Sequence, residues 1–202
     1  MKKHIYISSD YSEDNGDREV VKALKTWGYD NRYKVEFLDM AEVVSGSVSE
    51  NNPYCRPCDL KREFNQQINA SSSVIFVVGD KTADRKAGSN CSRFKYPQSD
   101  CSCTPYKQNA NGTKNCKVAS TTSAKENVGN INEYSYLQHE FEQAKKRQKN
   151  IIIVYNSLRK ESTWLPSYMK DYESCAQPFW IKNSNGEKVG DYNYIKQVLG
   201  YE

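Results

Sequence analysis

Short apolar runs and longer periodic segments alternate along the chain. An unbroken apolar run of strand length is typical of a parallel strand that is buried on both faces. Apolar residues that recur every three or four positions predict a helix with one buried face. On these patterns we expect strands in HIYIS, YKVEFLDM, SSSVIFVVGD, NIIIVYN and QPFWIK, and helices from about Asp17 and in DLKREFNQQIN, EYSYLQHEFE and DYNYIKQVL.

The first two predicted helices carry recognisable start and stop residues. Asp17 and Asp59 are expected to cap their amino ends, because a carboxylate accepts hydrogen bonds from the free backbone N–H groups there. Gly28 is expected to end the first helix. The predicted buried faces are Val20, Val21, Leu24 and Trp27 in the first helix, Leu60, Phe64 and Ile68 in the second, and Leu137, Phe141 and Ala144 in the third.

The alternation of strands and helices predicts a doubly wound, flavodoxin-like α/β fold with a five-stranded parallel sheet. Right-handed crossovers would place helices on both faces of the sheet. The polar segment 85–132 is too long for a simple connection, so we expect an insertion before the fourth strand within a single domain that spans residues 1–202. Ligands of such sheets bind outside the carboxyl ends of the strands, which here are residues 8–11, 38–40, 79–81 and 155–156.

Composition and charge favour a cytoplasmic protein. Mean hydropathy is −0.87, and no window approaches the apolar run that a membrane span needs. The net charge of +4 is concentrated between Asn90 and Thr122, within the insertion, where Arg93, Lys95, Lys107, Lys114 and Lys117 stand against Asp100. Such a basic loop can meet an anionic partner, although most basic loops are simply solvated. Nucleic acid is a weak candidate, because few aromatic residues interleave with these cations.

The seven cysteines are an odd number, which argues against a complete set of intramolecular disulfides. Cys55 and Cys58 form a CxxC pair, and Cys101 and Cys103 form a CxC pair. Thiolates could hold a structural zinc ion that staples the insertion, but the spacing matches no standard ligand pattern. Free thiols without metal are therefore the expectation.

Several common catalytic motifs are missing from the chain. No GxGxxG follows the first strand, and there is no GxxxxGK[ST] or GxSxG. Dinucleotide binding of the Rossmann type, phosphate binding by a P-loop and a nucleophile elbow are therefore unsupported. The two histidines, His4 and His139, are too few for a histidine-rich metal site.

Four segments occur in an order that resembles a known family. They are IYISSDY, FLDM, DLKREFNQQINASSSVIFVVGDKT and YSYLQHEFEQAKKRQKNIIIVYN. In this order they resemble the TIR domain, and most closely its bacterial TIR-like branch, which includes the NAD-handling subunit of the Thoeris anti-phage system. The resemblance covers roughly residues 2–156 without the insertion. It implies an enzyme that uses NAD as substrate and needs no further cofactor, assembles with other TIR domains, and signals to an effector through a small molecule.

The resemblance assigns roles to particular residues. Glu140 falls on the catalytic glutamate of TIR enzymes, and Tyr136 takes the aromatic position where the family more often has tryptophan. The loop of Ser8, Ser9, Asp10 and Tyr11 matches the nucleotide-side loop. Arg18, together with Asp17, resembles an acid–arginine pair at the start of the first helix, and residues 41–58 correspond to the loop that mediates assembly. From their places at strand ends, Asp39, Gly79 and Asp80 complete the expected set of NAD-binding residues.

The helical period distinguishes Glu140 from its neighbour Glu142. Tyr136 and Glu140 are four residues apart and share one edge of the buried face. Glu142 lies about 200° round the helix from Glu140, toward solvent. A fixed carboxylate beside the ribose would stabilise the positive charge that develops on the sugar when the nicotinamide bond of NAD breaks. Attack by water on the ribose would then give ADP-ribose, and attack by another group of the same molecule would give a cyclic product.

Three other readings remain open from the sequence. Glu140 can be an ordinary surface carboxylate. The chain can be a non-catalytic TIR-like adaptor or sensor that works by assembly. It can also be a nucleoside deoxyribosyltransferase-like enzyme, whose chemistry is likewise N-glycosidic and carboxylate-dependent.

Overall fold

The computed structural model describes residues 2–9, 16–32, 34–39, 56–84, 106–108, 114–116 and 135–201, and of these only the backbone for 56–62, 106–108 and 114–116. Its main sheet consists of β1 (Lys3–Ser8), β2 (Val35–Asp39), β3 (Ser73–Val78), β6 (Asn150–Tyr155) and β7 (Gln177–Pro178). The strand order is β2-β1-β3-β6-β7, and every pairing is parallel. This confirms the predicted five-stranded α/β sheet, and the order is compatible with a flavodoxin-like fold.

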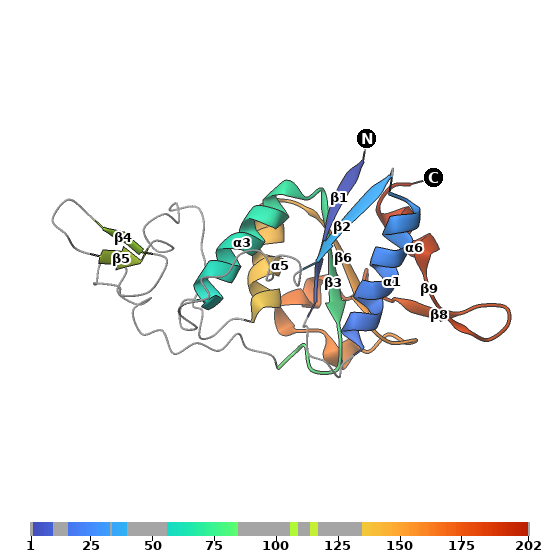
Figure 1. Ribbon diagram of the computed structural model, residues 1–202. Helices are drawn as coiled ribbons and strands as arrows, with labels where there is room; N and C mark the ends of the chain where they lie inside the picture. Colours follow the sequence, from blue (N-terminus) through green and yellow to red (C-terminus); the bar gives the residue numbers. More distant parts are fainter. Residues whose placement is uncertain are drawn as a thin grey trace.

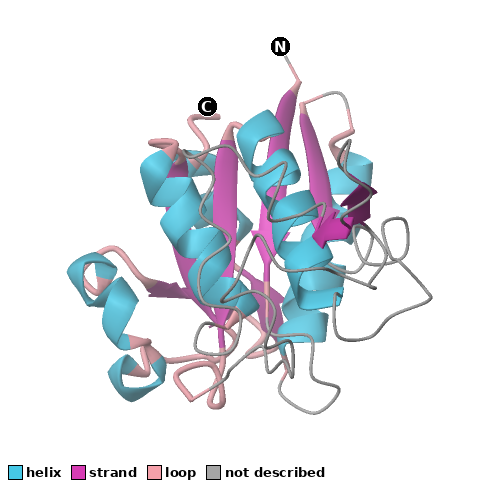
Figure 2. Ribbon diagram, turned by 90° about the vertical axis from the view of Figure 1, so that its left-hand side faces the viewer, coloured by secondary structure: helices cyan, strands magenta, loops and turns pink. Residues whose placement is uncertain are grey.

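Helices cover both faces of this sheet (Figures 1 and 2). The helix α3 (Arg56–Ala70) and the helix α5 (Tyr136–Lys146) lie on one face, and α1 (Asp17–Asp30) and α6 (Tyr192–Val198) lie on the other (Figure 1). Two short 3-10 helices, η2 (Ser162–Trp164) and η3 (Ser167–Tyr172), follow β6. Two antiparallel pairs stand apart from the main sheet: β4 (Tyr106–Gln108) with β5 (Lys114–Cys116), and β8 (Trp180–Lys182) with β9 (Lys188–Gly190).

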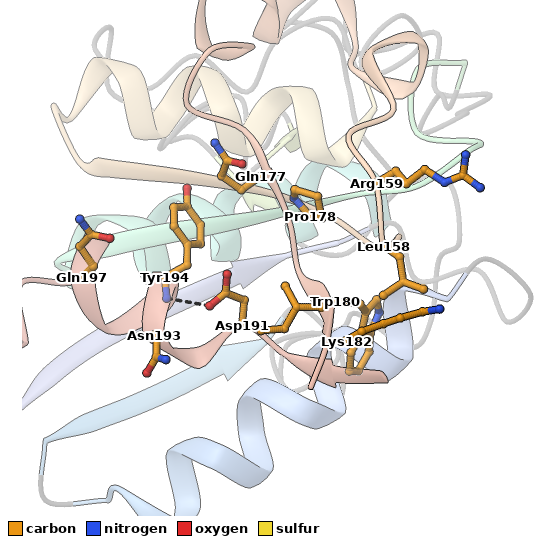
Figure 3. Close-up of a pocket in the computed structure, with 11 residues that line it drawn as sticks. Leu158, Arg159, Gln177, Pro178, Trp180, Lys182, Asp191, Asn193, Tyr194 and Gln197 are labelled. Atoms are coloured by element: carbon orange, nitrogen blue, oxygen red, sulfur yellow. Dashed lines mark hydrogen bonds between the residues drawn. The ribbon is translucent and has the colours of Figure 1, made fainter. Parts of the chain in front are cut away.

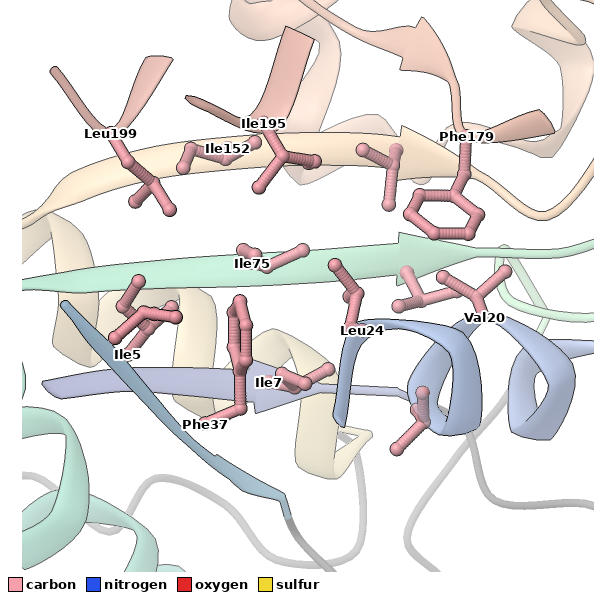
Figure 4. Packing of buried hydrophobic residues seen from close by; sticks show 14 of the residues in the cluster. Ile5, Ile7, Val20, Leu24, Phe37, Ile75, Ile152, Phe179, Ile195 and Leu199 are labelled. Atoms are coloured by element: carbon pink, nitrogen blue, oxygen red, sulfur yellow. The ribbon is translucent and has the colours of Figure 1, made fainter. Parts of the chain in front are cut away.

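The two-residue alternation of the strands divides the core into two layers. Side chains of one parity pack beneath α1 and α6, where Ile5, Ile75 and Ile152 meet Leu24 and Ile195 (Figure 4). Side chains of the other parity, including Phe76 and Ile153, pack beneath α3, α5 and η3. The apolar runs of β3 and β6 therefore serve both layers at once, as expected for parallel strands buried on both faces.

Gly28 does not end the first helix as the sequence predicts. The helix continues to Asp30, and its carboxyl end is closed by the Asn31 side chain, whose Nδ2 donates to the Trp27 carbonyl at 2.9 Å. A methyl group at Gly28 would lie 2.4 Å from the Phe37 ring. The glycine is therefore needed for the close approach of α1 to β2.

Two predicted caps are also corrected. Gly16, with φ of 78°, precedes α1, and Asp17 is the first helical residue rather than the cap. The helix α3 begins at Arg56, which places Asp59 inside it. The third helix begins at Tyr136 because the Ser135 hydroxyl accepts a hydrogen bond from the Gln138 N–H at 2.9 Å. The Asp17 carboxylate instead accepts a hydrogen bond from the Asn156 side chain, which lies far away in the sequence.

The run QPFWIK, predicted as one strand, divides into two. Gln177 and Pro178 pair with β6, and Trp180 to Lys182 leave the sheet to pair with β9. Pro178 has no N–H group for a further ladder bond, which suits it to this edge position. Of the predicted insertion 85–132, the structure describes only the backbone of β4 and β5, so its role lies outside the described residues.

Candidate functional site

The helix α5 delivers Glu140 to the sheet. Leu137, Phe141 and Ala144 anchor the helix in the core, as the sequence predicts. Glu140 lies on the same buried side and has no exposed surface, whereas Glu142 is exposed. The interpretation of Glu140 as a solvated surface carboxylate is therefore wrong.

Two hydroxyl groups of β1 hold the Glu140 carboxylate. The Tyr6 hydroxyl donates to Oε1 at 2.7 Å, and the Ser8 hydroxyl donates to Oε2. Tyr6 and Ser8 are two residues apart on one strand, so both side chains point to the same face of the sheet. Tyr6 is the site residue that the sequence reasoning missed, although the alternation of Ile5 and Ile7 with Tyr6 and Ser8 contains the signal.

Burial sets the charge state of this cluster. Removal from water raises the pKa of Glu140 to about 7, while the hydrogen bonds from Ser8 and Tyr6 act in the opposite direction because they favour the ionised form. Burial and the nearby Glu140 carboxylate raise the pKa of Tyr6, so its phenol keeps the proton that it donates. A carboxyl group that titrates near neutral pH can stabilise a cation when ionised and can supply a proton when neutral.

A second polar group lies at the carboxyl ends of β3 and β6. The Asn156 amide donates to Asp17 Oδ1 at 2.7 Å, and Asp17 is fully buried. A methyl group at Gly79 would lie 2.6 Å from Asn156 Nδ2 and 2.9 Å from Asp17 Oδ1. The backbone of Gly79 therefore lets these two side chains close over the end of β3, in a position that no larger residue could occupy without a shift.

Ser9 directly follows the last residue of β1, so in the sequence it lies after Ser8 of the Glu140 cluster and before Asp17. Ser9 is only 2% exposed, and its hydroxyl has no hydrogen-bond partner within the described ranges. A buried hydroxyl without a partner is uncommon and is a candidate contact for a ligand. Because the strand order reverses between β1 and β3, this is also the position where doubly wound sheets bind ligands.

The other predicted binding residues have different surroundings. Asp39 is buried and forms an ion pair with Lys25 at 2.9 Å, while Arg18 and Asp80 are exposed. Tyr136 lies one helical turn before Glu140 and packs edge-on against Phe64, with ring centroids 5.7 Å apart. Asp10 and Tyr11 lie outside the described residues, as does most of the predicted assembly loop 41–58.

The described parts of the chain contain neither a cluster of metal ligands nor a helix that could span a membrane. No three His, Cys, Asp or Glu side chains within them come together as metal ligands. Cys175 is the one cysteine whose side chain the structure describes, and it is exposed and free. The cysteines that were considered and disfavoured as zinc ligands, Cys55, Cys58, Cys101 and Cys103, have side chains that are not described. None of the described helices is long and apolar enough to cross a membrane.

The chain matches no protein-family model and no curated protein. Its function is therefore inferred from the geometry around Glu140 and from the order of the motifs in the sequence. What the geometry defines is a class of site: a buried, hydroxyl-bound carboxyl group with a pKa of about 7, near the carboxyl end of β1 in a doubly wound sheet.

Proposed function

We propose that this protein is a TIR-like enzyme that breaks the bond between nicotinamide and ribose in NAD. The observation that carries the proposal is the position of Glu140, which is fully buried beside the carboxyl end of β1 and held by the hydroxyl groups of Tyr6 and Ser8. Its place in the sequence is also the place of the catalytic glutamate in the family that the chain resembles.

The proposed chemistry needs one negative charge. When the bond between ribose C1′ and the nicotinamide nitrogen breaks, the bonding electrons go to nicotinamide, which leaves as a neutral molecule. The ribose becomes oxocarbenium-like, and the ionised Glu140 stabilises its positive charge. A single well-placed electrostatic group contributes about 3–4 kcal/mol, or ~10²–10³ in rate. No acid is needed, because nicotinamide is already a good leaving group.

The ribosyl cation is then captured by a nucleophile. Water would give linear ADP-ribose and release a proton. A nucleophilic group of the same ADP-ribose moiety would give a cyclic isomer, which we propose as the product because it can act as a signal to a partner effector in anti-phage defence. Exclusion of water from the site favours the cyclic product.

The complete burial of Glu140 bears on how such an enzyme is controlled. Since the carboxylate has no exposed surface, a substrate can reach it only when neighbouring groups move aside. We therefore propose that this conformation is a resting state, and that self-assembly or another trigger during infection opens the site.

The test is NAD consumption in extracts of phage-infected cells that express the protein. Glu140→Gln keeps the size and removes the charge, so we expect consumption to fall by ~10²–10³. Glu142→Gln is the matched control, because Glu142 is an exposed glutamate of the same helix. Equal consumption by wild type and Glu140→Gln would refute the assignment, and no consumption by either would favour the assembly adaptor. Chromatography of the product separates linear from cyclic ADP-ribose.

A nucleoside deoxyribosyltransferase-like activity is the second candidate, and the pKa of Glu140 favours it specifically. An uncharged nucleobase leaves more easily when it is protonated, and a carboxyl group with a pKa of about 7 can supply that proton at neutral pH. Release of free base from nucleosides, with NAD left intact, would identify this activity.

A further inference from the structure

Four polar side chains join the helices α3 and α5, which lie next to each other on one face of the sheet (Figure 1). The His139 Nε2–H donates to Asn65 Oδ1 at 2.9 Å, and the Gln143 side-chain amide donates to Asn69 Oδ1 at 2.8 Å. Because an amide oxygen only accepts, the Nε2 atom of His139 carries the proton in this contact. We call these four side chains the polar seam, and three of them, Asn65, His139 and Gln143, are at most 4% exposed.

The spacing of the polar seam admits one alignment of the two helices. Its members are four residues apart within each helix, and both pairs are separated by 74 residues in the sequence. The helices therefore run in the same direction, and the two pairs lie one helical turn apart. A slide of α5 by one turn, about 5.4 Å, would bring Gln143 opposite Asn65 and leave His139 and Asn69 without these partners. Unpaired buried polar groups are costly, so the seam selects a single alignment.

Lys149, which follows α5, fastens the carboxyl ends of both helices. Its ammonium group donates to the backbone carbonyls of Asn69 at 2.8 Å and of Ser71 at 2.6 Å. Asn69 is therefore bound twice, through its side chain by Gln143 and through its carbonyl by Lys149. Both contacts oppose the same displacement of α5 along α3.

The contacts on the other side of α5 are aromatic and less directional. The Phe141 ring meets Phe76 of β3 and the Tyr168 and Tyr172 rings of η3, with centroids between 5.4 and 5.6 Å apart. Apolar contacts of this kind can repack around a displaced helix with a modest loss of stability. Directional information about the alignment of α5 therefore comes from the polar seam.

Glu140 lies beside the polar seam on the surface of the helix. At 100° per residue it is about 60° round the helix from Gln143 and about 40° from Ala144, so it lies between the seam and the face that packs on the sheet. From this edge its carboxylate reaches the hydroxyl groups of Tyr6, at 2.7 Å, and of Ser8. Hydrogen bonds weaken beyond about 3.2 Å, so a displacement of α5 by about 1 Å would break these contacts.

From this arrangement we infer that His139 and Gln143 are positioning residues for Glu140. Through the polar seam they set the alignment of α5 on α3, and this alignment keeps the carboxylate at the two hydroxyl groups of β1. The catalytic consequence rests on the proposed function, whereas the positioning of the carboxylate can be tested without NAD.

The test is a double-mutant cycle between the polar seam and Tyr6, read by carbon-13 NMR titration of the Glu140 carboxyl group. In the otherwise wild-type protein, Tyr6→Phe should raise the pKa of Glu140, because it removes a hydrogen bond that favours the ionised form. In a background that carries His139→Leu and Gln143→Leu, the carboxylate should already have left the Tyr6 hydroxyl. Tyr6→Phe should then cause no shift.

Two controls separate alignment from stability. His139→Gln keeps an amide donor in place of the ring N–H and should retain the shift caused by Tyr6→Phe. Ile68→Val removes a methylene from the buried face of α3, lowers stability without touching the polar seam, and should also retain the shift. Asn69→Ala breaks the seam from the other helix and should reduce the shift, so the result does not depend on the folding of the double leucine variant.

The catalytic consequence is measured as kcat for NAD cleavage by the triggered enzyme. The double leucine variant should lose roughly tenfold or more in kcat, because its carboxylate is misplaced, whereas Ile68→Val should cleave NAD as wild type does. Equal shifts on Tyr6→Phe in the wild-type and double leucine backgrounds would overturn the inference, as would an unchanged kcat in a variant that has lost the shift. If Glu140→Gln cleaves NAD as fast as wild type, the proposed function fails, while the cycle still decides the positioning of Glu140. The two failures are therefore distinguishable.

Discussion

The buried carboxyl group of Glu140 should make the protein less stable as pH rises. An unfolded chain ionises this residue around its ordinary pKa of 4.5, whereas the folded chain retains the proton up to about pH 7. Between these values the folded state binds more protons, so the free energy of unfolding falls with increasing pH. The difference of about 2.5 pKa units corresponds to about 3 kcal/mol.

Glu140→Gln removes this dependence, because glutamine stays neutral. Its amide can accept from Tyr6 and donate to Ser8, so both hydroxyl groups keep a partner. The variant should resemble wild type in stability near pH 4.5 and exceed it by about 3 kcal/mol at pH 8. For a chain of this length such a gain corresponds to a rise of roughly 6–12 °C in Tm.

Urea unfolding followed by circular dichroism, at intervals from pH 4.5 to 8, measures the effect directly. The informative quantity is the difference between Glu140→Gln and wild type, since the other titrating groups cancel in it. Glu142→Gln serves as control, because Glu142 is an exposed glutamate of the same helix. If the difference for Glu140→Gln stays constant with pH within about 0.5 kcal/mol, the reasoning from burial is wrong.

Three further substitutions test other contacts. Tyr6→Phe removes a hydrogen bond that favours the ionised form, so it should raise the pKa of Glu140 and move the pH midpoint of NAD cleavage upward. An unmoved midpoint would contradict this. Gly28→Ala should destabilise the protein by about 1–3 kcal/mol in thermal unfolding, and Phe37→Leu should recover part of the loss because it makes room for the methyl group. Gly79→Ala should lower the rate of NAD cleavage strongly and the Tm only slightly, since the clash falls on the edge of the sheet that forms the site. A variant with the activity and the stability of wild type would count against that location.

The elements of the main sheet could be predicted because their signals are local. The runs VIFVV and IIIVY are apolar on both faces, and only a buried parallel strand suits such a pattern. The buried apolar face of α5, marked by Leu137, Phe141 and Ala144, followed from the helical period alone. The errors at Gly28 and Asp17 have a common cause, since each residue is selected by a tertiary contact rather than by its own helix.

The site could be predicted only in part. The sequence could place Glu140 at one edge of the buried helix face. It could not identify its partner Tyr6, which comes from a strand 134 residues away in the sequence. The groove of about 960 Å³ at the β7 edge of the sheet (Figure 3) was not predictable, because its walls come from four separate segments that only the folded chain brings together. Trp180 reads as an ordinary strand residue until the structure reveals that its N–H has no partner among the described groups.

The most direct test of the central claim is the pH dependence of kcat/KM for NAD cleavage by the triggered enzyme. If the ionised Glu140 carboxylate carries the reaction, kcat/KM rises with pH, passes a midpoint between the ordinary pKa of 4.5 and the value of about 7 that full burial gives, and levels off above it. The residual activity of Glu140→Gln should then be flat across the same range. A wild-type profile without a transition in this range, or the same transition in Glu140→Gln, would contradict the account.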